Sequence, residues 1–280
     1  MTYIVFDIGG TKSRVGVSED LETFIGHVSF KTPKSATEGV AKLLEEAEKI
    51  SPKAKIKGIA GGIRGQLNEQ KSGIDNDSVL TSWAGKDIKA IFKKAHNVPI
   101  FLENDTAIAG VGEAAFGAGK GLELVAYHTV STGVGGAKIE NGEIDHASMG
   151  FEPGHQILDI DRTILGEEIS PTLENLVSGT AVEERFGVKA YEIPQSDILW
   201  DELAGYLAQG LRNTILYWSP DAIILGGSMI IGDPKIKIDA IRKATVDALD
   251  GFVEAPLITT AKLGDEAGLY GGLALLKKRL

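Results

Sequence analysis

The chain has 280 residues, 43 % of them hydrophobic and 24 % charged, proportions typical of one large folded domain or two modest ones. Its formal net charge of −10 argues against a nucleic-acid partner, because such proteins usually carry a basic face. The absence of cysteine excludes disulfides and thiolate metal sites.

No membrane or export signal is visible in the sequence. Residues 1–10 lack a basic segment followed by an apolar stretch, and no apolar run approaches the ~18 residues that span a bilayer. We therefore expect a cytoplasmic protein with no membrane partner. A small phosphate ligand is compatible with the acidic charge, because backbone amides and a few cations can hold it locally.

The first elements are strands joined by a glycine turn. Residues 3–17 alternate apolar and other positions on both sides of that turn, which predicts two strands, and residues 23–30 predict a third. An amphipathic pattern then predicts a helix over 37–50. A short buried strand over 56–60 follows and runs into the glycine loop 61–65.

The same pattern returns near the middle of the chain. Residues 122–130 predict a strand, 131–136 a glycine-rich turn and 137–140 a second strand, and Asn141-Gly142 favours a hairpin into a third. Repetition on this scale suggests two related α/β domains facing each other across a cleft. Two independent glycine-rich hairpins are the alternative.

The remaining predicted elements are mainly helical, and no linker or low-complexity segment separates them. They are a strand over 98–102, a small-residue helix over 107–116, a helix over 196–217, a strand over 221–225, and helices over 236–249 and 268–280.

The first glycine turn has the chemistry of a phosphate-binding loop. Gly9 and Gly10 have no Cβ, so their backbone N–H groups can approach an anion. Thr11 adds a hydroxyl donor and Lys12 a compact positive charge. Asp7 could hold Mg²⁺ through water. Taken alone, this motif is better explained as a hairpin with a capping aspartate.

The second glycine turn supports the phosphate interpretation. Thr132, Gly133 and Gly135 repeat the hydroxyl and glycine pattern, and two such turns could clamp a nucleotide's phosphates from opposite sides. The sequence contains neither G-x-x-x-x-G-K-[ST] nor a strand-to-helix G-x-G-x-x-G, which disfavours those nucleotide folds. The segment 226–228 follows a buried strand and allows close approach of a flat group such as adenosine, or forms a plain turn.

Acidic residues follow the predicted strand over 98–102. A carboxylate at the end of a buried strand is costly unless it is solvated, paired or used. Asp105 lies near a predicted helix N-terminus, where the helix dipole favours the ionised form. The structural alternative is an ordinary N-cap.

A set of polar residues could surround a polyol. Glu152 and His155 share one tight turn, and Glu174 lies further along the chain. Sugar hydroxyls need such partners, because a buried unpaired polar group costs about 1–3 kcal/mol. Each of these residues alone has a structural explanation, either a satisfied histidine or a solvated helix charge.

Six segments in this order resemble the ROK family, bacterial and archaeal sugar kinases and sugar-responsive repressors with an actin-like ATPase fold. They are Asp7 to Lys12, Glu103 to Asp105, Ser131 to Gly136, Glu152 to His155, Glu174 before Ser178-Gly179, and Gly226 to Ser228. The resemblance implies two actin-like (ribonuclease H-like) α/β domains flanking a central cleft. Residues 1–103 plus 268–280 would form the smaller domain and 104–267 the larger.

The resemblance also implies ATP-dependent phosphorylation of a hexose hydroxyl, with ATP and Mg²⁺ as cofactors and glucose as the first candidate substrate. Asp105 would be the catalytic base. The implied sugar contacts are Gly65, Asn104, Asp105, Glu152, His155 and Glu174. The implied nucleotide contacts are Asp7 (through Mg²⁺), Gly9, Gly10, Thr11, Lys12, Thr132, Gly133, Gly135, Gly226, Gly227 and Ser228.

Two departures from the family pattern matter. Many members bind zinc through the histidine of the E-x-G-H turn and three cysteines, so the cysteine-free segment 157–172 excludes a zinc site of that kind. Phe151 stands where the family usually has a small residue, and we expect it to narrow the pocket. Alternatives are a kinase for N-acetylated hexosamine, mannose or fructose, and a sugar-sensing binding protein without catalysis. Family members often form dimers, so a homodimer is compatible with the resemblance.

Overall fold

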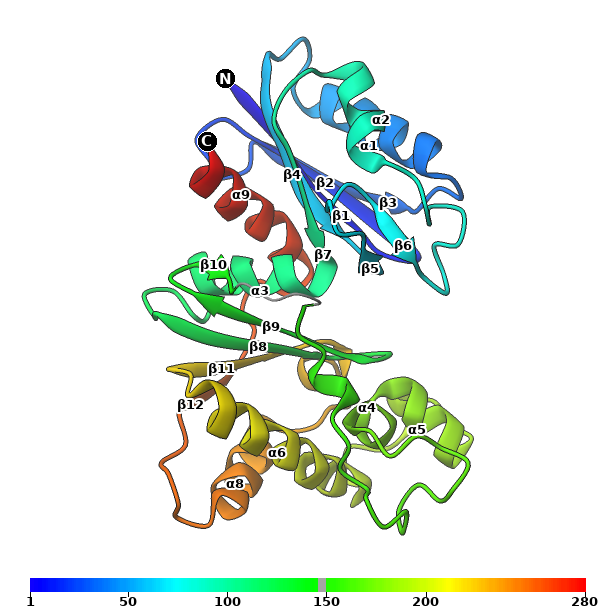
Figure 1. Cartoon of the computed structure of the whole chain (residues 1–280), viewed down its shortest axis with the longest axis vertical. Coiled ribbons are helices and arrows are strands. Elements are labelled where there is room, and N and C mark those ends of the chain that lie inside the picture. The colour runs from blue at the N-terminus through cyan, green and yellow to red at the C-terminus, as the bar shows by residue number, and fades with distance from the viewer. Residues whose placement is uncertain (146–149) are drawn as a thin grey trace. The chain divides into compact units, whose positions relative to one another are not determined.

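The computed structural model describes residues 1–145 and 150–280 (Figure 1). The chain forms two compact units, Met1–Ala115 with Asp265–Leu280, and Phe116–Gly264. The first unit thus extends past the predicted boundary at residue 103. The reason is α3 (Asp105–Ala115), which packs against α9 (Ala267–Arg279) inside the first unit.

The first unit is built on a five-stranded sheet of order β3-β2-β1-β4-β7. The antiparallel part consists of β3 (Gly26–Lys31), β2 (Lys12–Ser18) and β1 (Thr2–Ile8). The strands β1, β4 (Ile56–Ile63) and β7 (Ile100–Asn104) run parallel. Their carboxyl ends therefore lie at one edge of the sheet, the usual position for ligand binding in such folds.

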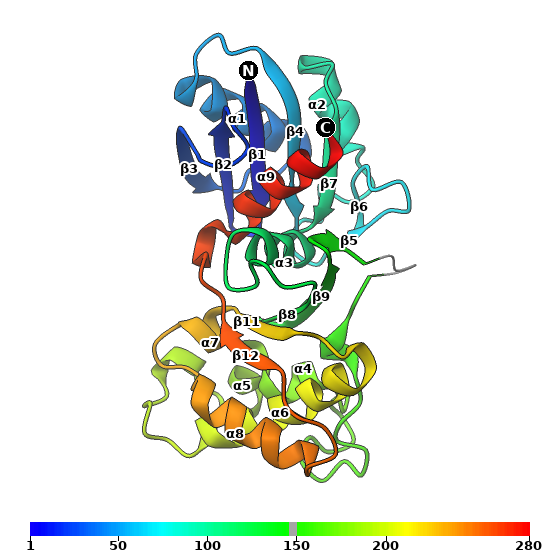
Figure 2. The same ribbon diagram turned by 90° about the vertical axis from the view of Figure 1, so that its left-hand side faces the viewer.

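Helices cover both faces of this sheet. Figure 2 shows α9 on one face, and α1 (Ala36–Ile50) and α2 (Ile88–Ala95) on the other. The core lies between α1, α2 and the sheet, where Val40 and Leu43 share one buried cluster with Phe6 and Phe92, whose rings stack. A small hairpin of β5 (Gln66–Leu67) and β6 (Ile74–Asn76) follows β4.

The contact between α3 and α9 explains the small residues of α3. A Cβ at Gly112 would lie 2.2 Å from the carbonyl oxygen of Ala267, and a Cβ at Gly271 would lie 1.8 Å from that of Ile108. Only glycine permits so close an approach of two helix backbones. This packing fixes the position of α3, and with it the residue that begins the helix, Asp105.

The second unit repeats the sheet of the first. Its five strands have the order β10-β9-β8-β11-β12, with the same sequence of antiparallel and parallel pairs. They are β8 (Leu124–Val130), β9 (Val134–Glu140), β10 (Glu143–Ile144), β11 (Ala222–Gly226) and β12 (Leu257–Thr260). The prediction of two related α/β domains is therefore confirmed by the topology.

Helices pack on the second sheet around a large apolar core. The long helix α6 (Leu199–Trp218) contributes Leu203, Leu207 and Leu211, which are fully buried. The other helices are α4 (Leu173–Val177), α5 (Gly179–Phe186), α7 (Ser228–Ile231) and α8 (Ile238–Leu249). Within the described ranges, no helix combines the length and apolar character that a bilayer crossing requires.

Candidate active site

The ends of three parallel strands bring acidic residues together in the first unit. Asp7 at the end of β1 lies opposite Gly62 of β4, and Gly62 lies opposite Glu103 of β7. A Cβ at Gly62 would lie 3.1 Å from the Cα of Asp105. The missing side chain of Gly62 therefore lets the start of α3 approach the strand edge that carries Asp7.

The helix cap at this edge is Asn104. Its Oδ1 accepts hydrogen bonds from the backbone N–H groups of Thr106 (2.9 Å) and Ala107 (3.2 Å), and its Nδ2 donates to the carbonyl oxygen of Gly65 (3.2 Å). Asp105 Oδ1 accepts a bond from the N–H of Thr106 at 2.8 Å. Because Asn104 already satisfies the helix end, capping does not explain the carboxylate of Asp105.

Burial governs the protonation of both carboxylates. It raises the pKa of Asp105, against the lowering effects of the Thr106 hydrogen bond and the Arg64 charge, whereas we expected its position at a helix N-terminus to favour the ionised form. Burial and then the nearby charge of Asp105 raise the pKa of Asp7 from 3.8 to about 6, against the lowering effect of Arg14. Two buried carboxylates that interact in this way form a strong site for a proton or a cation.

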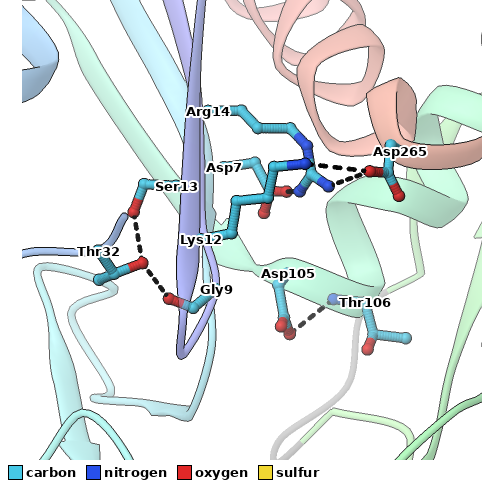
Figure 3. Close-up of polar contacts among 9 residues, drawn as sticks. All are labelled: Asp7, Gly9, Lys12, Ser13, Arg14, Thr32, Asp105, Thr106 and Asp265. Atoms are coloured by element: carbon cyan, nitrogen blue, oxygen red, sulfur yellow. Dashed lines mark hydrogen bonds and ion pairs between the residues drawn. The ribbon is translucent and has the colours of Figure 1, made fainter. Parts of the chain in front are cut away.

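Two partners of Asp7 and Lys12 were not predicted (Figure 3). Arg14 on β2 lies opposite Asp7, and its Nη1 donates to Asp7 Oδ2 at 3.0 Å. Its Nη2 donates to Asp265 Oδ2 at 2.5 Å, and Lys12 Nζ lies 3.6 Å from the same oxygen. The antiparallel register of the hairpin could have revealed Arg14, whereas Asp265 lies 251 residues away in sequence.

The first glycine turn is held by its own backbone and by two hydroxyls. The N–H of Gly9 donates to the carbonyl oxygen of Lys12 at 3.1 Å. On the other side, Thr32 Oγ1 donates to the carbonyl of Gly9 at 2.8 Å and lies 2.9 Å from Ser13 Oγ (Figure 3). Thr11 and Lys12 are exposed, so their donors remain accessible to a ligand.

The second glycine turn is contacted by a carboxylate of α4. Glu174 Oε2 accepts the N–H of Val134 at 2.8 Å, and a Cβ at Gly133 would lie 2.7 Å from the same oxygen. The turn closes through Ser131, whose N–H donates to the carbonyl of Gly133 at 2.8 Å. The structure thus brings two of the predicted residues, Gly133 and Glu174, into contact.

The segment 226–228 adjoins the same turn. Gly226 ends β11, and Gly227 has φ +87, with a Cβ position 2.3 Å from the carbonyl oxygen of Val130. Glycine is required there on both counts. Ser228 Oγ lies 3.0 Å from Ser131 Oγ, so the predicted adenosine loop and the second turn meet through two hydroxyls.

The turn that contains Glu152 and His155 packs beside β9. A Cβ at Gly136 would lie 2.5 Å from Pro153 Cγ, and a Cβ at Gly154 would lie 2.3 Å from the carbonyl oxygen of Val134. Glu152 and His155 are exposed. This packing holds the predicted sugar-binding turn against the strand that follows the second glycine turn.

Phe151, which we expected to narrow the pocket, packs within the second unit. Its ring meets Trp218 of α6 edge-on, with 5.1 Å between ring centroids. Trp218 in turn lies 6.1 Å from the ring of the fully buried His128. The influence of Phe151 on sugar choice stays a prediction.

The predicted site residues therefore fall into two groups, one on each unit. The first unit carries Asp7, Gly9, Gly10, Thr11, Lys12, Gly65, Asn104 and Asp105. The second carries Thr132, Gly133, Gly135, Glu152, His155, Glu174, Gly226, Gly227 and Ser228.

Comparison with known proteins matches this arrangement to one family. The family model described as "ROK family" matches residues 3–279. The chain belongs to the ROK family. A ROK hexokinase from Thermus thermophilus has a similar structure, with a TM-score of 0.85 and 29% identity over 100% of this chain and 99% of that one.

Two further relatives cover most of the chain. A ROK family protein from Streptococcus pneumoniae TIGR4, solved in complex with sucrose, has a TM-score of 0.83 and 27% identity over 100% of both chains. A fructokinase from Lactococcus lactis subsp. cremoris is 27% identical over 259 residues, which are 91% of this chain and 87% of the relative. The predicted family and the actin-like fold are thus confirmed.

The cysteine-free segment 157–172 of this ROK protein is held by a carboxylate. Asp159 is 2% exposed, and its Oδ2 accepts the backbone N–H groups of Ile164 (3.2 Å) and Leu165 (2.7 Å). An isolated bridge between Ile157 and Thr172 closes the base of the segment. The hydrogen bonds from these backbone N–H groups to the buried Asp159 carboxylate therefore tie the segment together without a metal ligand set of cysteines.

The donor set of the first unit fits a magnesium ion held through water. Mg²⁺ usually binds one or two carboxylates, keeps several waters and takes its other ligands from substrate phosphates. In the described part of the chain, no three His, Cys, Asp or Glu side chains form a cluster that could hold a metal by themselves. Asp7, whose pKa burial and Asp105 raise, is a carboxylate that a cation would stabilise in its ionised form.

Proposed function

We propose that this protein is an ATP-dependent kinase that phosphorylates a hexose hydroxyl, with Asp105 as the catalytic base. Membership of the ROK family over nearly the whole chain supports the sugar-kinase activity. The observation that carries the role of Asp105 is a largely buried carboxylate near Asp7, at a helix end that Asn104 already caps. Such a group costs stability, so a role in catalysis accounts for its retention.

The reaction forms a bond between the acceptor oxygen of the sugar and the γ-phosphorus of ATP and breaks the bond from that phosphorus to ADP. Asp105 takes the proton of the acceptor hydroxyl. Burial makes Asp105 a better proton acceptor than an exposed aspartate, because the efficiency of a general base rises with its pKa as long as it stays ionised. Most of the remaining catalysis is positioning and charge stabilisation.

The phosphates would be bound by backbone amides and hydroxyls of both glycine turns. Thr11 and Lys12 supply exposed donors in the first turn, and Thr132 is exposed in the second. Mg²⁺ near Asp7 would neutralise charge on the phosphate oxygens when bound. Gly227 and Ser228 would contact the adenosine.

The sugar would be held by Glu152, His155 and Glu174 together with Gly65 and Asn104. The amide of Asn104 already donates one hydrogen to Gly65 and accepts two bonds, so one N–H remains for a sugar hydroxyl. Glucose phosphorylated at its 6-hydroxyl is the first candidate. Fructose is the second, because the Lactococcus lactis relative is named a fructokinase.

The test of Asp105 compares Asp105→Asn with Asp75→Asn, a matched change at an exposed aspartate of the same unit. Loss of a general base lowers rates by about 10²- to 10⁴-fold, so the first variant should lose turnover on this scale and keep sugar affinity in calorimetry. The second variant should match the wild type. Turnover retained by Asp105→Asn would remove Asp105 from the role.

The substrate is identified by measuring ADP release with glucose, fructose, mannose and N-acetylated hexosamines. The sugar with the highest kcat/KM is the substrate that the site selects. A chain that binds one of these sugars in calorimetry but releases ADP with none of them would be a sugar-sensing binding protein, contrary to the proposal.

A further inference from the structure

Arg14 links two carboxylates that come from distant parts of the first unit. One guanidinium nitrogen donates to Asp7 on β1, and another donates to Asp265, just before α9 (Figure 3). The two bonds use different nitrogens of one planar group, which a lysine could not reproduce. Arg14 and Asp7 have side chains only 17% and 15% exposed, so this bond is better shielded from water than a surface ion pair.

The carboxylate of Asp7 is confined from two sides. Arg14 holds Oδ2, and the first turn of α9 lies close behind, since a Cβ at Gly268 would be 3.1 Å from Asp7 Cγ. Oδ1 makes no hydrogen bond to any residue in the described ranges. The contacts therefore orient the carboxylate, leaving one oxygen for a ligand that the protein itself does not provide.

We propose that Arg14 is a positioning residue of the phosphoryl-donor site, which fixes the Asp7 carboxylate so that Oδ1 can receive a hydrated divalent cation with its nucleotide. This inference rests on the proposed function for the identity of the nucleotide. Arg14 itself does not touch the nucleotide. It acts through its shielded bond to Asp7, and its other bond, to the exposed Asp265, is secondary.

The experiment measures ADP affinity by calorimetry with Mg²⁺ and with a chelator, for the wild type, Arg14→Met and Arg14→Lys. Wild-type affinity should rise when Mg²⁺ is present. In Arg14→Met this Mg²⁺-dependent gain should fall about tenfold or more, the effect of losing one charge-assisted hydrogen bond, while chelated ADP binds as in the wild type. Arg14→Lys should recover part of the gain, because it retains the charge without the fork.

Two other variants separate positioning from a structural tie. Asp265→Ala removes the exposed partner and keeps the Arg14–Asp7 bond, so its Mg²⁺-dependent gain should stay within about threefold of wild type. Gly268→Ala displaces Asp7 with all charges intact and should reduce the gain. If Arg14→Met does not fold, the Mg²⁺-dependent gains in ADP affinity of Arg14→Lys, Asp265→Ala and Gly268→Ala still distinguish a positioning role of Arg14 from a structural one.

Three results would overturn the inference: Asp265→Ala reproduces the loss, chelated ADP binding falls as much as Mg²⁺-bound binding, or wild-type affinity does not respond to Mg²⁺. These results are distinguishable from failure of the proposed function. A wild type that phosphorylates sugar without a Mg²⁺ effect on ADP contradicts only the role of Arg14. If Arg14→Met loses the Mg²⁺-dependent gain in ADP affinity that the wild type shows, but the wild type phosphorylates no sugar, only the proposed function is contradicted.

Discussion

The two glycine turns have the same backbone setting and different side chains. In the first unit, Asp7 lies opposite Arg14 across the hairpin. In the second, the matching pair one step before the strand end is Thr129 opposite Gly135. Each of the two residues also faces a glycine on a neighbouring parallel strand. Asp7 lies opposite Gly62 of β4, and Thr129 lies opposite Gly226 of β11.

The difference shows that one repeated backbone frame can carry two different chemical settings. The first turn is surrounded by charge, with Asp7, Arg14, Lys12 and Asp265 in one network. The second has a single carboxylate, Glu174, and otherwise depends on close backbone packing, as at Gly227, and on hydroxyls such as the pair Ser131 and Ser228. A hydrated cation suits the first setting, and direct backbone contact suits the second.

Glycine substitutions should break this comparison most strongly. Gly227→Ala adds a Cβ at a positive φ and 2.3 Å from a backbone oxygen, which should destabilise the protein by about 3 kcal/mol. Gly10→Ala, the control in the first turn, meets the exposed Val79 side chain at 2.9 Å and no backbone atom, so it should cost about 1 kcal/mol or less. Urea unfolding measures both, and equal losses would contradict a sterically closed second turn.

Removing charge from the first turn should stabilise the metal-free protein. A raised pKa in the folded state means that ionisation of Asp7 weakens folding, and a rise from 3.8 to about 6 corresponds to about 3 kcal/mol at most. Asp7→Asn should therefore be more stable than wild type above pH 6. The advantage should shrink as pH falls from 6 to 3.8 and vanish below.

Thermal or urea unfolding in the presence of a chelator, at several pH values, tests this prediction. The matched change Thr129→Val at the corresponding strand position of the second unit removes no charge and should give a difference independent of pH. A pH-independent effect of Asp7→Asn would show that the buried carboxylate does not destabilise the fold.

Much of the fold could be predicted because the strands around each glycine turn have clear alternation. The structure places β1 and β2 over residues 2–18, one residue beyond the predicted range 3–17 at each end, and begins α1 one residue before its predicted start. The short elements α2, α4 and β12 were missed. Helix α2 does have a local signal in its Asp87 cap and its buried Ile88 and Phe92. The five-residue α4 is too short for a clear period, and its Leu173 and Leu176 are defined by burial in the core of the second unit.

The candidate site could be predicted as a set of residues but not as a network. Asp105 was a candidate because a carboxylate at the end of a buried strand is costly without a partner or a function. The alternative role, capping the helix, could be assigned to Asn104 only from the hydrogen bonds of the structure. Arg14 was within reach, since a turn closed between Gly9 and Lys12 places it opposite Asp7. Asp265 was not, because only the folded chain brings α9 to the first turn.

The smallest effect expected concerns the carboxylate that supports the second turn. Glu174→Ala removes the acceptor of the Val134 N–H and should destabilise the protein by about 1 kcal/mol, whereas Glu174→Gln keeps an acceptor and should stay near wild type. If Glu174 also binds sugar, both variants should raise the KM for sugar, because an amide replaces the charged acceptor poorly. A stability loss in Glu174→Ala without any change in KM would make Glu174 a support of the turn and remove it from the sugar site.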